Sequence, residues 1–201
     1  MPIDPHSRIM ALADRKSVLT AGDIARGGIH SQQLTRMVQS GVLERLARGQ
    51  YRLVNSPISE NHGLVMASRA VPRGVICLLS ALSFHGIGTQ LPADIWIAIP
   101  RGTRTPTIDQ PPLHIVHFSA AAFTAGIQHH RLEGITVPVY SVAKTLADLF
   151  KFRNQIGIDV AIEALREAWR DRRFRMDALD DAAIACRVER VMRPYIEAIV
   201  S

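Results

Sequence analysis

The sequence has few cysteines and no long hydrophobic segment. Its 201 residues include two cysteines, Cys77 and Cys186, which lie far apart in apolar surroundings and form no CxxC pair. We therefore expect both to be reduced core residues of a cytoplasmic protein, and not disulfide or metal ligands. No apolar run approaches the roughly 20 residues that a membrane span needs. The N-terminus lacks the basic-then-apolar pattern of a signal peptide, so we expect no membrane partner.

The eight histidines do not form a metal-binding pattern. His114 and His117 lie three apart on a predicted strand, so their side chains point to opposite faces. No helix carries an HExxH pair, and no phosphate-binding glycine loop or GxSxG motif is present. His85 lies at a predicted helix end beside glycines, where a capping or packing role is favoured over a functional one. We expect neither a metal nor a cofactor.

Carboxylates in the arrangement of a nuclease are also missing. Asp94 precedes a predicted strand, but no Glu-x-Lys follows on the next one. Asp148 and Lys144 lie four residues apart on a predicted helix, where a salt bridge explains them. The sequence therefore predicts a protein that is not an enzyme, with a nuclease as the less favoured alternative.

Positive charge is in excess and unevenly placed. The chain has 24 Lys and Arg against 18 Asp and Glu, a net charge of +6. Residues 1–57 hold eight basic and four acidic residues, so they carry +4 of that excess. This distribution favours an anionic partner for the N-terminal part. A second basic run, 166–175, is mixed with acidic residues; it is explained by a solvated helix face, with an acidic partner or DNA backbone contacts as alternatives.

Residues 20–54 contain two short predicted helices. Thr20 is the expected N-cap of the first, and Gly27-Gly28 ends it. Ser31 is the expected N-cap of the second helix, which Gly41 ends. Leu34, Met37 and Val38 recur at helical spacing and predict its buried side.

A basic hairpin follows these helices. The hydrophobic period changes to two after Gly41, and Gly49-Gln50 is expected to turn the chain. Arg45, Arg48 and Arg52 make this hairpin basic, while we assign Tyr51 to packing beneath it. The order of two helices and a hairpin predicts a winged helix-turn-helix, which lays one helix in the major groove of DNA and a hairpin on the backbone. A protein-binding module is the alternative.

Eight residues form the candidate DNA-binding site. Gln and Arg form bidentate pairs with adenine and guanine edges, so the base-reading residues are expected to be Gln32, Gln33 and Arg36. Phosphate contacts fix register and make binding fall with salt. They are expected from Ser31, Thr35, Arg45, Arg48 and Arg52.

The rest of the chain predicts an α+β domain. A helix over 5–17 completes the winged domain, 1–55, and residues 55–57 form the linker to a larger domain, 60–201. That domain is expected to have a small central sheet followed by C-terminal helices. The expected strands are 95–99, 113–118, 127–132 and 135–140. The expected helices are 60–71, one from near Ser80, one capped by Ser141 and running to Phe152, 156–171, one capped by Asp177, and 187–200. The clearest is 156–171, where Ile158, Ile162, Leu165 and Trp169 recur at helical spacing.

The chain also resembles a known family. The segments RLARGQYRLV, SALSFHG, IPRGTR, SVAKTLADLFKFR and RPYIEA occur in the order seen in AbiEi-type antitoxins of bacterial abortive-infection systems. The resemblance covers about residues 8 to 199, and the winged helix alone is its least specific part. It implies a type IV antitoxin that represses its own operon by binding promoter repeats through the winged helix. It also implies that the C-terminal domain carries the antitoxic activity.

The resemblance further implies a nucleotidyltransferase-like toxin as the functional partner, without a stable complex. A monomer or weak dimer that binds DNA repeats cooperatively is expected, since no heptads announce a dimer interface. An orphan regulator whose second domain senses a small molecule is the alternative function, and a module that binds the toxin directly is another.

Overall fold

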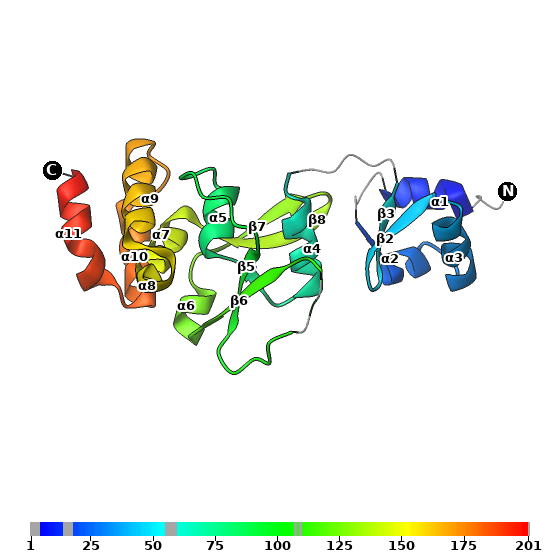
Figure 1. Ribbon diagram of the computed structural model, residues 1–201, viewed down its shortest axis with the longest axis horizontal. Helices are drawn as coiled ribbons and strands as arrows, with labels where there is room; N and C mark the ends of the chain where they lie inside the picture. The colour runs from blue at the N-terminus through cyan, green and yellow to red at the C-terminus, as the bar shows by residue number, and fades with distance from the viewer. Residues whose placement is uncertain (1–4, 14–17, 55–59, 107, 109, 201) are drawn as a thin grey trace. The chain divides into compact units, whose positions relative to one another are not determined.

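The computed structural model describes residues 5–13, 18–54, 60–106, 108 and 110–200 (Figure 1). By its internal contacts the chain divides into two compact units, residues 1–66 with 131–136, and residues 67–130 with 137–201. The predicted linker, 55–57, lies outside the described residues. The predicted domain limits therefore stay a prediction.

The N-terminal part contains three helices and a small sheet. The elements are α1 (Pro5–Ala13), β1 (Leu19–Thr20), α2 (Ala21–Arg26), α3 (Ser31–Gln39), β2 (Leu43–Ala47) and β3 (Gln50–Leu53). The strands pair antiparallel in the order β1-β3-β2. The predicted helix-turn-helix order and hairpin are confirmed, while β1 was not expected. Of the predicted first helix, residues 14–17 lie outside the described part of the chain.

Thr20 caps α2 as its sequence predicts, and Asp23 completes a capping box. Asp23 donates its backbone N–H to Thr20 Oγ1 at 3.0 Å, and Thr20 donates its own N–H to Asp23 Oδ2 at 3.1 Å. Two backbone donors at the helix start are satisfied by this exchange. Gly28, with φ of +75°, then lets the chain leave the helix.

The core beneath this sheet is apolar. Its buried side chains are Ile9, Leu19, Ile24, Ile29, Leu34, Met37 and Leu43. Tyr51 packs against them, which confirms its predicted role. The hairpin turn falls at Arg48-Gly49 and not at Gly49-Gln50, because Gln50 is already paired with Thr20 and Ala47. The register shifts between Arg45 and Ala47, so β2 carries a bulge beside the turn.

The rest of the chain forms a five-stranded mixed sheet with helices, which confirms the predicted α+β class. The strands have the order β6-β5-β4-β8-β7. Strand β4 pairs antiparallel with β5 and parallel with β8, while β5 and β6 are parallel. The strands are β4 (Val75–Ile76), β5 (Ile95–Pro100), β6 (Leu113–Phe118), β7 (Ile127–Leu132) and β8 (Ile135–Tyr140).

Helices precede, interrupt and follow this sheet, and Figure 1 shows the later ones gathered beyond one end of it. They are α4 (His62–Ala70), α5 (Leu78–Phe84), α6 (Ala120–Thr124), α7 (Val142–Lys151), α8 (Arg153–Ile156), α9 (Ile158–Arg170), α10 (Met176–Cys186) and α11 (Glu189–Val200). Among the described helices, none combines the length and hydrophobicity needed to cross a bilayer.

Several helix starts in this part of the chain differ from the prediction, and α4 and α11 each begin two residues later than expected. Helix α5 begins at Leu78 and not near Ser80, because the chain turns directly out of the short strand β4. Gly157, with φ of +108°, separates α8 from α9, so the helix expected from 156 begins at Ile158. The N-cap of α10 is Arg175, and Asp177 lies in the first turn. Ser141 caps α7 as predicted, accepting the Lys144 N–H at 3.3 Å.

Candidate nucleic-acid interface

Helix α3 presents polar side chains above a buried apolar side. Leu34 and Met37 are buried, whereas Gln32, Thr35 and Arg36 are exposed. Gln32 and Arg36 lie four residues apart and so share one face of the helix. Two of the three expected base-reading side chains therefore point to solvent together.

The start of α3 differs from the sequence prediction. Its N-cap is His30, and Ser31 is the first helical residue. The Gln33 side chain accepts the His30 N–H through Oε1 at 3.1 Å, and it is half-buried. The prediction of Ser31 as the N-cap was wrong because serine is a more common N-cap residue than histidine. Gln33 thus helps to fix the helix N-terminus, which separates it from Gln32 and Arg36.

The residues expected to contact phosphates near the helix start are both exposed. Ser31 stands at the first helical position, where backbone N–H groups have no partner within the helix. Thr35 donates its hydroxyl to the Ser31 carbonyl at 3.0 Å. This bond uses the only donor of the hydroxyl, and a phosphate oxygen needs a donor, so Thr35 is less suited than Ser31 to hold a phosphate.

The three hairpin arginines fall into two kinds. Arg45 lies on β2 and Arg48 in the turn, and both are exposed. Arg52 lies opposite Glu44 across the two strands, and its Nε donates to Glu44 Oε1. The Arg52 side chain is only 11% exposed. Arg52 therefore stabilises the hairpin, and its charge is less available to an anion than that of Arg48.

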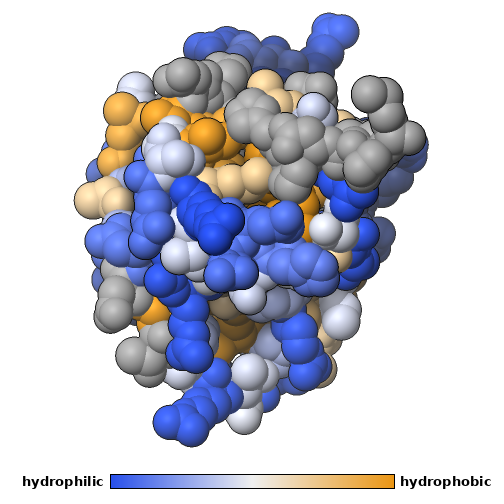
Figure 2. Space-filling view, turned by 90° about the vertical axis from the view of Figure 1, so that its right-hand side faces the viewer, coloured by the Kyte–Doolittle hydropathy of each residue, from blue (hydrophilic) through white to orange (hydrophobic). Residues whose placement is uncertain are grey.

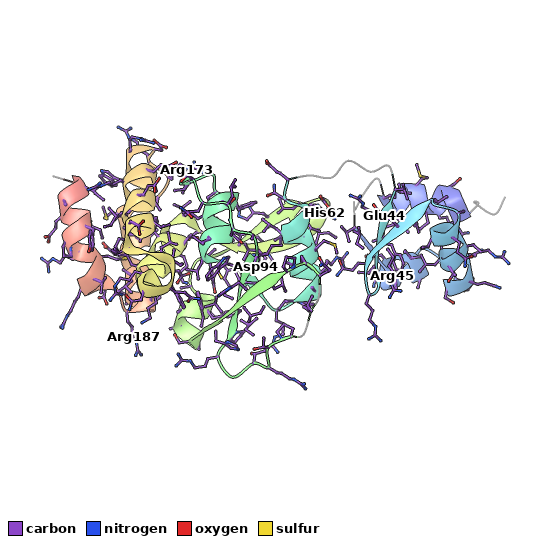
Figure 3. The ribbon with its side chains drawn as sticks, in the orientation of Figure 1. Glu44, Arg45, His62, Asp94, Arg173 and Arg187 are labelled. Atoms are coloured by element: carbon purple, nitrogen blue, oxygen red, sulfur yellow. The ribbon has the colours of Figure 1, made fainter. Side chains whose placement is uncertain are left out.

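Two views show how these side chains are presented. Figure 3 places Glu44 and Arg45 on the hairpin of the N-terminal part. In Figure 2, which looks at the end of the chain that carries the N-terminal part, hydrophilic side chains run through the middle of the face and hydrophobic ones lie beside them.

A buried ion pair occupies the core of the sheet and helix unit. Lys144 and Asp148 are both fully buried, and Lys144 Nζ lies 2.6 Å from each Asp148 oxygen. Lys144 Nζ also lies 4.1 Å from the centre of the Tyr140 ring and 4.6 Å from that of Phe118. The predicted salt bridge is thus confirmed, but it lies in the core and not on a surface.

Burial controls the titration of the groups around this pair. It raises the pKa of Asp148 to about 6 against the opposing charge and hydrogen bonds of Lys144. The Cys186 thiol donates to Asp148 Oδ1 at 3.2 Å, and burial raises its pKa to about 12. Burial likewise raises the pKa of Cys77 well above its usual range. Both cysteines are free and buried, as expected, and both are held as thiols.

The other residues considered for chemistry have structural surroundings. His85 is the C-cap of α5, and its Nε2 lies 2.7 Å from the Tyr140 carbonyl oxygen, which confirms the packing role. Burial lowers its pKa, so it is held neutral. Asp94 is exposed in the loop before β5. Within the described residues, no three His, Cys, Asp or Glu side chains are grouped closely enough to hold a metal ion.

Two of the five arginines in the basic run, 166–175, are paired with aspartates on the surface. Arg170 pairs with Asp171 at 2.9 Å, and Arg175 pairs with Asp177 at 2.5 Å. Arg173 donates to the His85 carbonyl oxygen at 2.7 Å. This geometry fits the solvated-face interpretation better than a second nucleic-acid surface.

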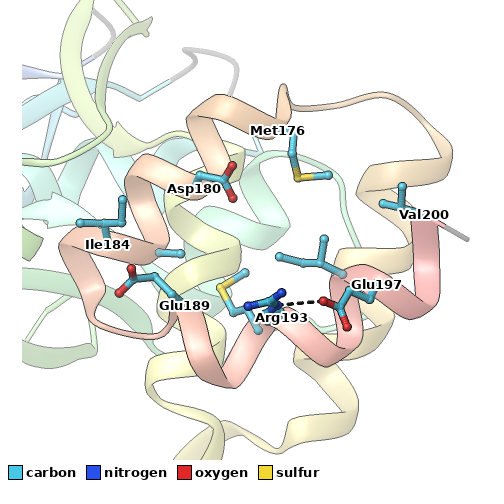
Figure 4. Close-up of a pocket in the computed structure, with 10 residues that line it drawn as sticks. Met176, Asp180, Ile184, Glu189, Arg193, Glu197 and Val200 are labelled. Atoms are coloured by element: carbon cyan, nitrogen blue, oxygen red, sulfur yellow. Dashed lines mark hydrogen bonds and ion pairs between the residues drawn. The ribbon is translucent and has the colours of Figure 1, made fainter.

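A groove between α10 and α11 is the largest hollow of this unit that we describe, with a volume of about 770 Å³ (Figure 4). Its walls include Met176, Ile184, Met192 and Val200. Figure 4 shows Arg193 bonded to Glu197 at its rim, at a distance of 2.8 Å. Asp180 and Glu189 also line the groove, so its apolar walls are bordered by charged side chains.

Comparison with known proteins agrees with the N-terminal geometry. Residues 7–54, which contain α2, α3 and the hairpin, match a family model described as "Transcriptional regulator, AbiEi antitoxin". This segment is therefore similar to AbiEi-type transcriptional regulators. The match confirms the expected resemblance over about a quarter of the chain. No curated protein sequence matches the chain.

One solved structure shares the fold over most of the chain. It is titled "Crystal structure of RV2827C protein from Mycobacterium tuberculosis". The match has a TM-score of 0.61 and 18% sequence identity, and it covers 89% of this chain and 70% of that one. At this identity the likeness shows a common fold only. The AbiEi match therefore carries the functional argument, and it does so through the N-terminal residues.

Proposed function

We propose that this protein is a DNA-binding transcriptional autorepressor and antitoxin of a type IV, AbiE-like toxin–antitoxin system. One observation carries the DNA-binding half: Gln32 and Arg36 lie exposed on one face of α3, next to a hairpin whose turn carries the exposed Arg48. A helix that reads base edges and a cation that holds the backbone are the two elements of winged-helix recognition. The protein acts as a regulator in the cytoplasm and needs no catalytic chemistry.

The proposed contacts divide by chemistry. Gln32 and Arg36 read bases, with Gln33 contributing through its amide N–H groups while its oxygen caps the helix. Ser31, Thr35, Arg45 and Arg48 hold phosphates. Arg52, which the sequence assigned to phosphate, is proposed to support the hairpin through Glu44 and to add only a distant positive charge.

The DNA-binding half is tested on the DNA upstream of the protein's own gene. The full chain is expected to bind that duplex more tightly than a shuffled duplex of equal length. The Gln32→Ala variant is expected to lower the ratio of these two affinities. Gln39→Ala is the matched control, because Gln39 is also exposed on α3 but near its C-terminal end. Equal binding to both duplexes by the unaltered chain would contradict the proposal.

The antitoxin half is tested by co-expression with a nucleotidyltransferase-like protein encoded beside this gene. Growth is expected to be restored when the chain is present, including in the Arg36→Ala variant, because the resemblance assigns antitoxicity to the C-terminal part. The two proteins are not expected to co-purify. Failure to restore growth would leave a DNA-binding regulator and overturn the antitoxin assignment.

A small-molecule-sensing regulator is the second candidate function. A polar cavity in the C-terminal unit favours it, since a pocket with converging charged groups is typical of a ligand site. In this candidate function the N-terminal part still binds DNA, but the C-terminal unit binds a metabolite instead of counteracting a toxin.

A further inference from the structure

A cavity of about 490 Å³ lies among the ends of several elements in the C-terminal unit. Its walls come from β6, α6, α7 and the C-terminal end of α10, with one residue from the loop after β5. This volume falls within the range of about 300 to 1,000 Å³ typical of small-molecule sites. Its size alone suits a compact ligand and not a protein.

Three cations from different parts of the sequence line this cavity. They are Arg101 after β5, Lys151 at the end of α7 and Arg187 after α10. All three are exposed, and none of their side chains forms an ion pair within the described part of the chain. Arg170 and Arg175, by contrast, are each paired with a neighbouring aspartate. The cavity therefore collects positive charge that the protein leaves uncompensated.

One carboxylate lines the cavity, and its charge is already matched. Asp148 is bonded through both oxygens to Lys144 in the core. The lining residues and Lys144 together carry three positive charges in excess, with His117 and Ser119 as further polar groups. Such a concentration of like charge in a concave surface attracts anions.

Backbone hydrogen bonds fix the position of the main chain at Arg101 and at Arg187. The Arg101 N–H donates to the Phe118 carbonyl oxygen at 2.7 Å, so the loop after β5 is tied to the end of β6. Arg187 adopts the left-handed region, with φ of +57°, and its N–H donates to the Ile184 carbonyl oxygen at 3.0 Å. A non-glycine residue with this backbone is uncommon. Figure 3 shows Arg187 at the end of the helical part, on the same side as α6.

An aromatic stack forms another part of the wall. The Phe118 ring is stacked on Tyr140 with centroids 5.7 Å apart and on Phe152 with centroids 5.4 Å apart. Phe118 and Phe152 both line the cavity, and Phe152 is partly exposed. A flat ring bound against Phe152 would extend an existing stack, which is a favourable aromatic arrangement.

We propose that this cavity binds a phosphorylated nucleoside, with its phosphates held by Arg101, Lys151 and Arg187 and its base against Phe152. Arginine suits phosphate because its planar group donates two parallel hydrogen bonds, and lysine adds a compact positive charge. The site involves none of the residues proposed to contact DNA. The phosphates of a nucleic acid share this chemistry, so the test separates a free nucleotide from a duplex.

Isothermal titration calorimetry on the full chain tests the proposal with inorganic pyrophosphate, the four common nucleoside triphosphates and a short DNA duplex. At least one triphosphate is expected to bind more tightly than pyrophosphate. The Lys151→Ala, Arg187→Ala double variant is expected to lose at least tenfold in affinity for both. Arg166→Ala is the matched control, since Arg166 is exposed on α9 outside the cavity, and it should change nothing.

Phe152→Leu separates the base from the phosphates. It is expected to weaken the triphosphate and to leave pyrophosphate unchanged, which a general loss of folding would not do. The absence of binding by all these probes at millimolar concentration would overturn the proposal. So would a double variant that binds them normally, or one that loses only duplex binding, because the cavity would then belong to a nucleic-acid surface.

Discussion

The N-terminal winged part and the C-terminal sheet and helix unit place their charges in opposite ways. The winged part has an apolar core and carries Arg36, Arg45 and Arg48 on its surface. The C-terminal unit buries a lysine and an aspartate in its centre and collects three unpaired cations around a cavity. In the first, exposed positive charge on a winged-helix shape supports the proposal of a DNA partner. In the second, the chemistry is visible only once the chain has folded.

The largest expected effect on stability comes from the buried pair of Lys144 and Asp148. Lys144→Met leaves Asp148 without its partner in the core, where it must either stay charged or take up a proton, and this should destabilise the C-terminal unit by about 3–5 kcal/mol. The Lys144→Met, Asp148→Leu double variant should recover most of that loss, because neither charge is then buried. Urea unfolding of the three proteins measures both changes. A single variant as stable as the unaltered chain would show that the pair does not govern this core.

The pH dependence of stability sharpens the same point. Burial raises the pKa of Asp148 to about 6, against a usual value of 3.8. A carboxyl whose pKa is raised on folding favours the folded state most at low pH, and that contribution is lost as the pH rises to about 6. The unaltered chain should therefore lose stability relative to the double variant between about pH 4 and pH 6.

Unfolding of both proteins across this window measures the difference. Cys186, Cys77 and Tyr140 also face the pair, but burial raises the pKa of each, so none of them titrates there. If the unaltered chain instead gains relative stability as the pH rises, Lys144 stabilises the carboxylate by more than burial disfavours it.

A smaller effect is expected in the winged part. Thr20→Ala removes the acceptor for the Asp23 N–H at the start of α2 and should cost about 1 kcal/mol. Hydrogen exchange should show the loss in amides of residues 18–54, while those of α7 and α9 keep their protection. Equal loss in both places would mean that the two units unfold together.

The smallest effect concerns the hairpin pair. Glu44→Gln removes the charge opposite Arg52 and should cost about 0.2–1 kcal/mol, as for pairs near a surface. It should also free the Arg52 guanidinium and slightly strengthen binding to any duplex. A fluorescence titration at two salt concentrations measures this gain, and weaker binding would contradict the supporting role given to Arg52.

Local patterns predicted much of the fold. Ile158, Ile162, Leu165 and Trp169 at helical spacing predicted α9, and Thr20 with Asp23 predicted the start of α2. The strands β1 and β4 escaped prediction because each has two residues, and their pairing depends on strands distant in sequence. A two-residue segment has no hydrophobic period to detect.

The residues of the candidate sites, like the elements of the fold, could be predicted from the sequence only where local patterns determine them. The exposure of Gln32 and Arg36 follows from the helical period of Leu34 and Met37. That Arg52 is largely covered could not be deduced, because it depends on the register that places Glu44 opposite it. Arg101, Lys151 and Arg187 are separated by 36 residues or more in the sequence, and only the packed fold brings them to one cavity.

The central claim, that α3 reads sequence while the hairpin holds the backbone, is tested most directly by comparing Arg36→Ala with Arg48→Ala. Affinities for the upstream duplex and a shuffled duplex are measured over a series of salt concentrations. Arg36→Ala should reduce the difference in binding free energy between the two duplexes by about 1–3 kcal/mol. Arg48→Ala should weaken both alike and reduce the salt slope by about one. Unchanged binding to the upstream duplex in both variants would contradict the account.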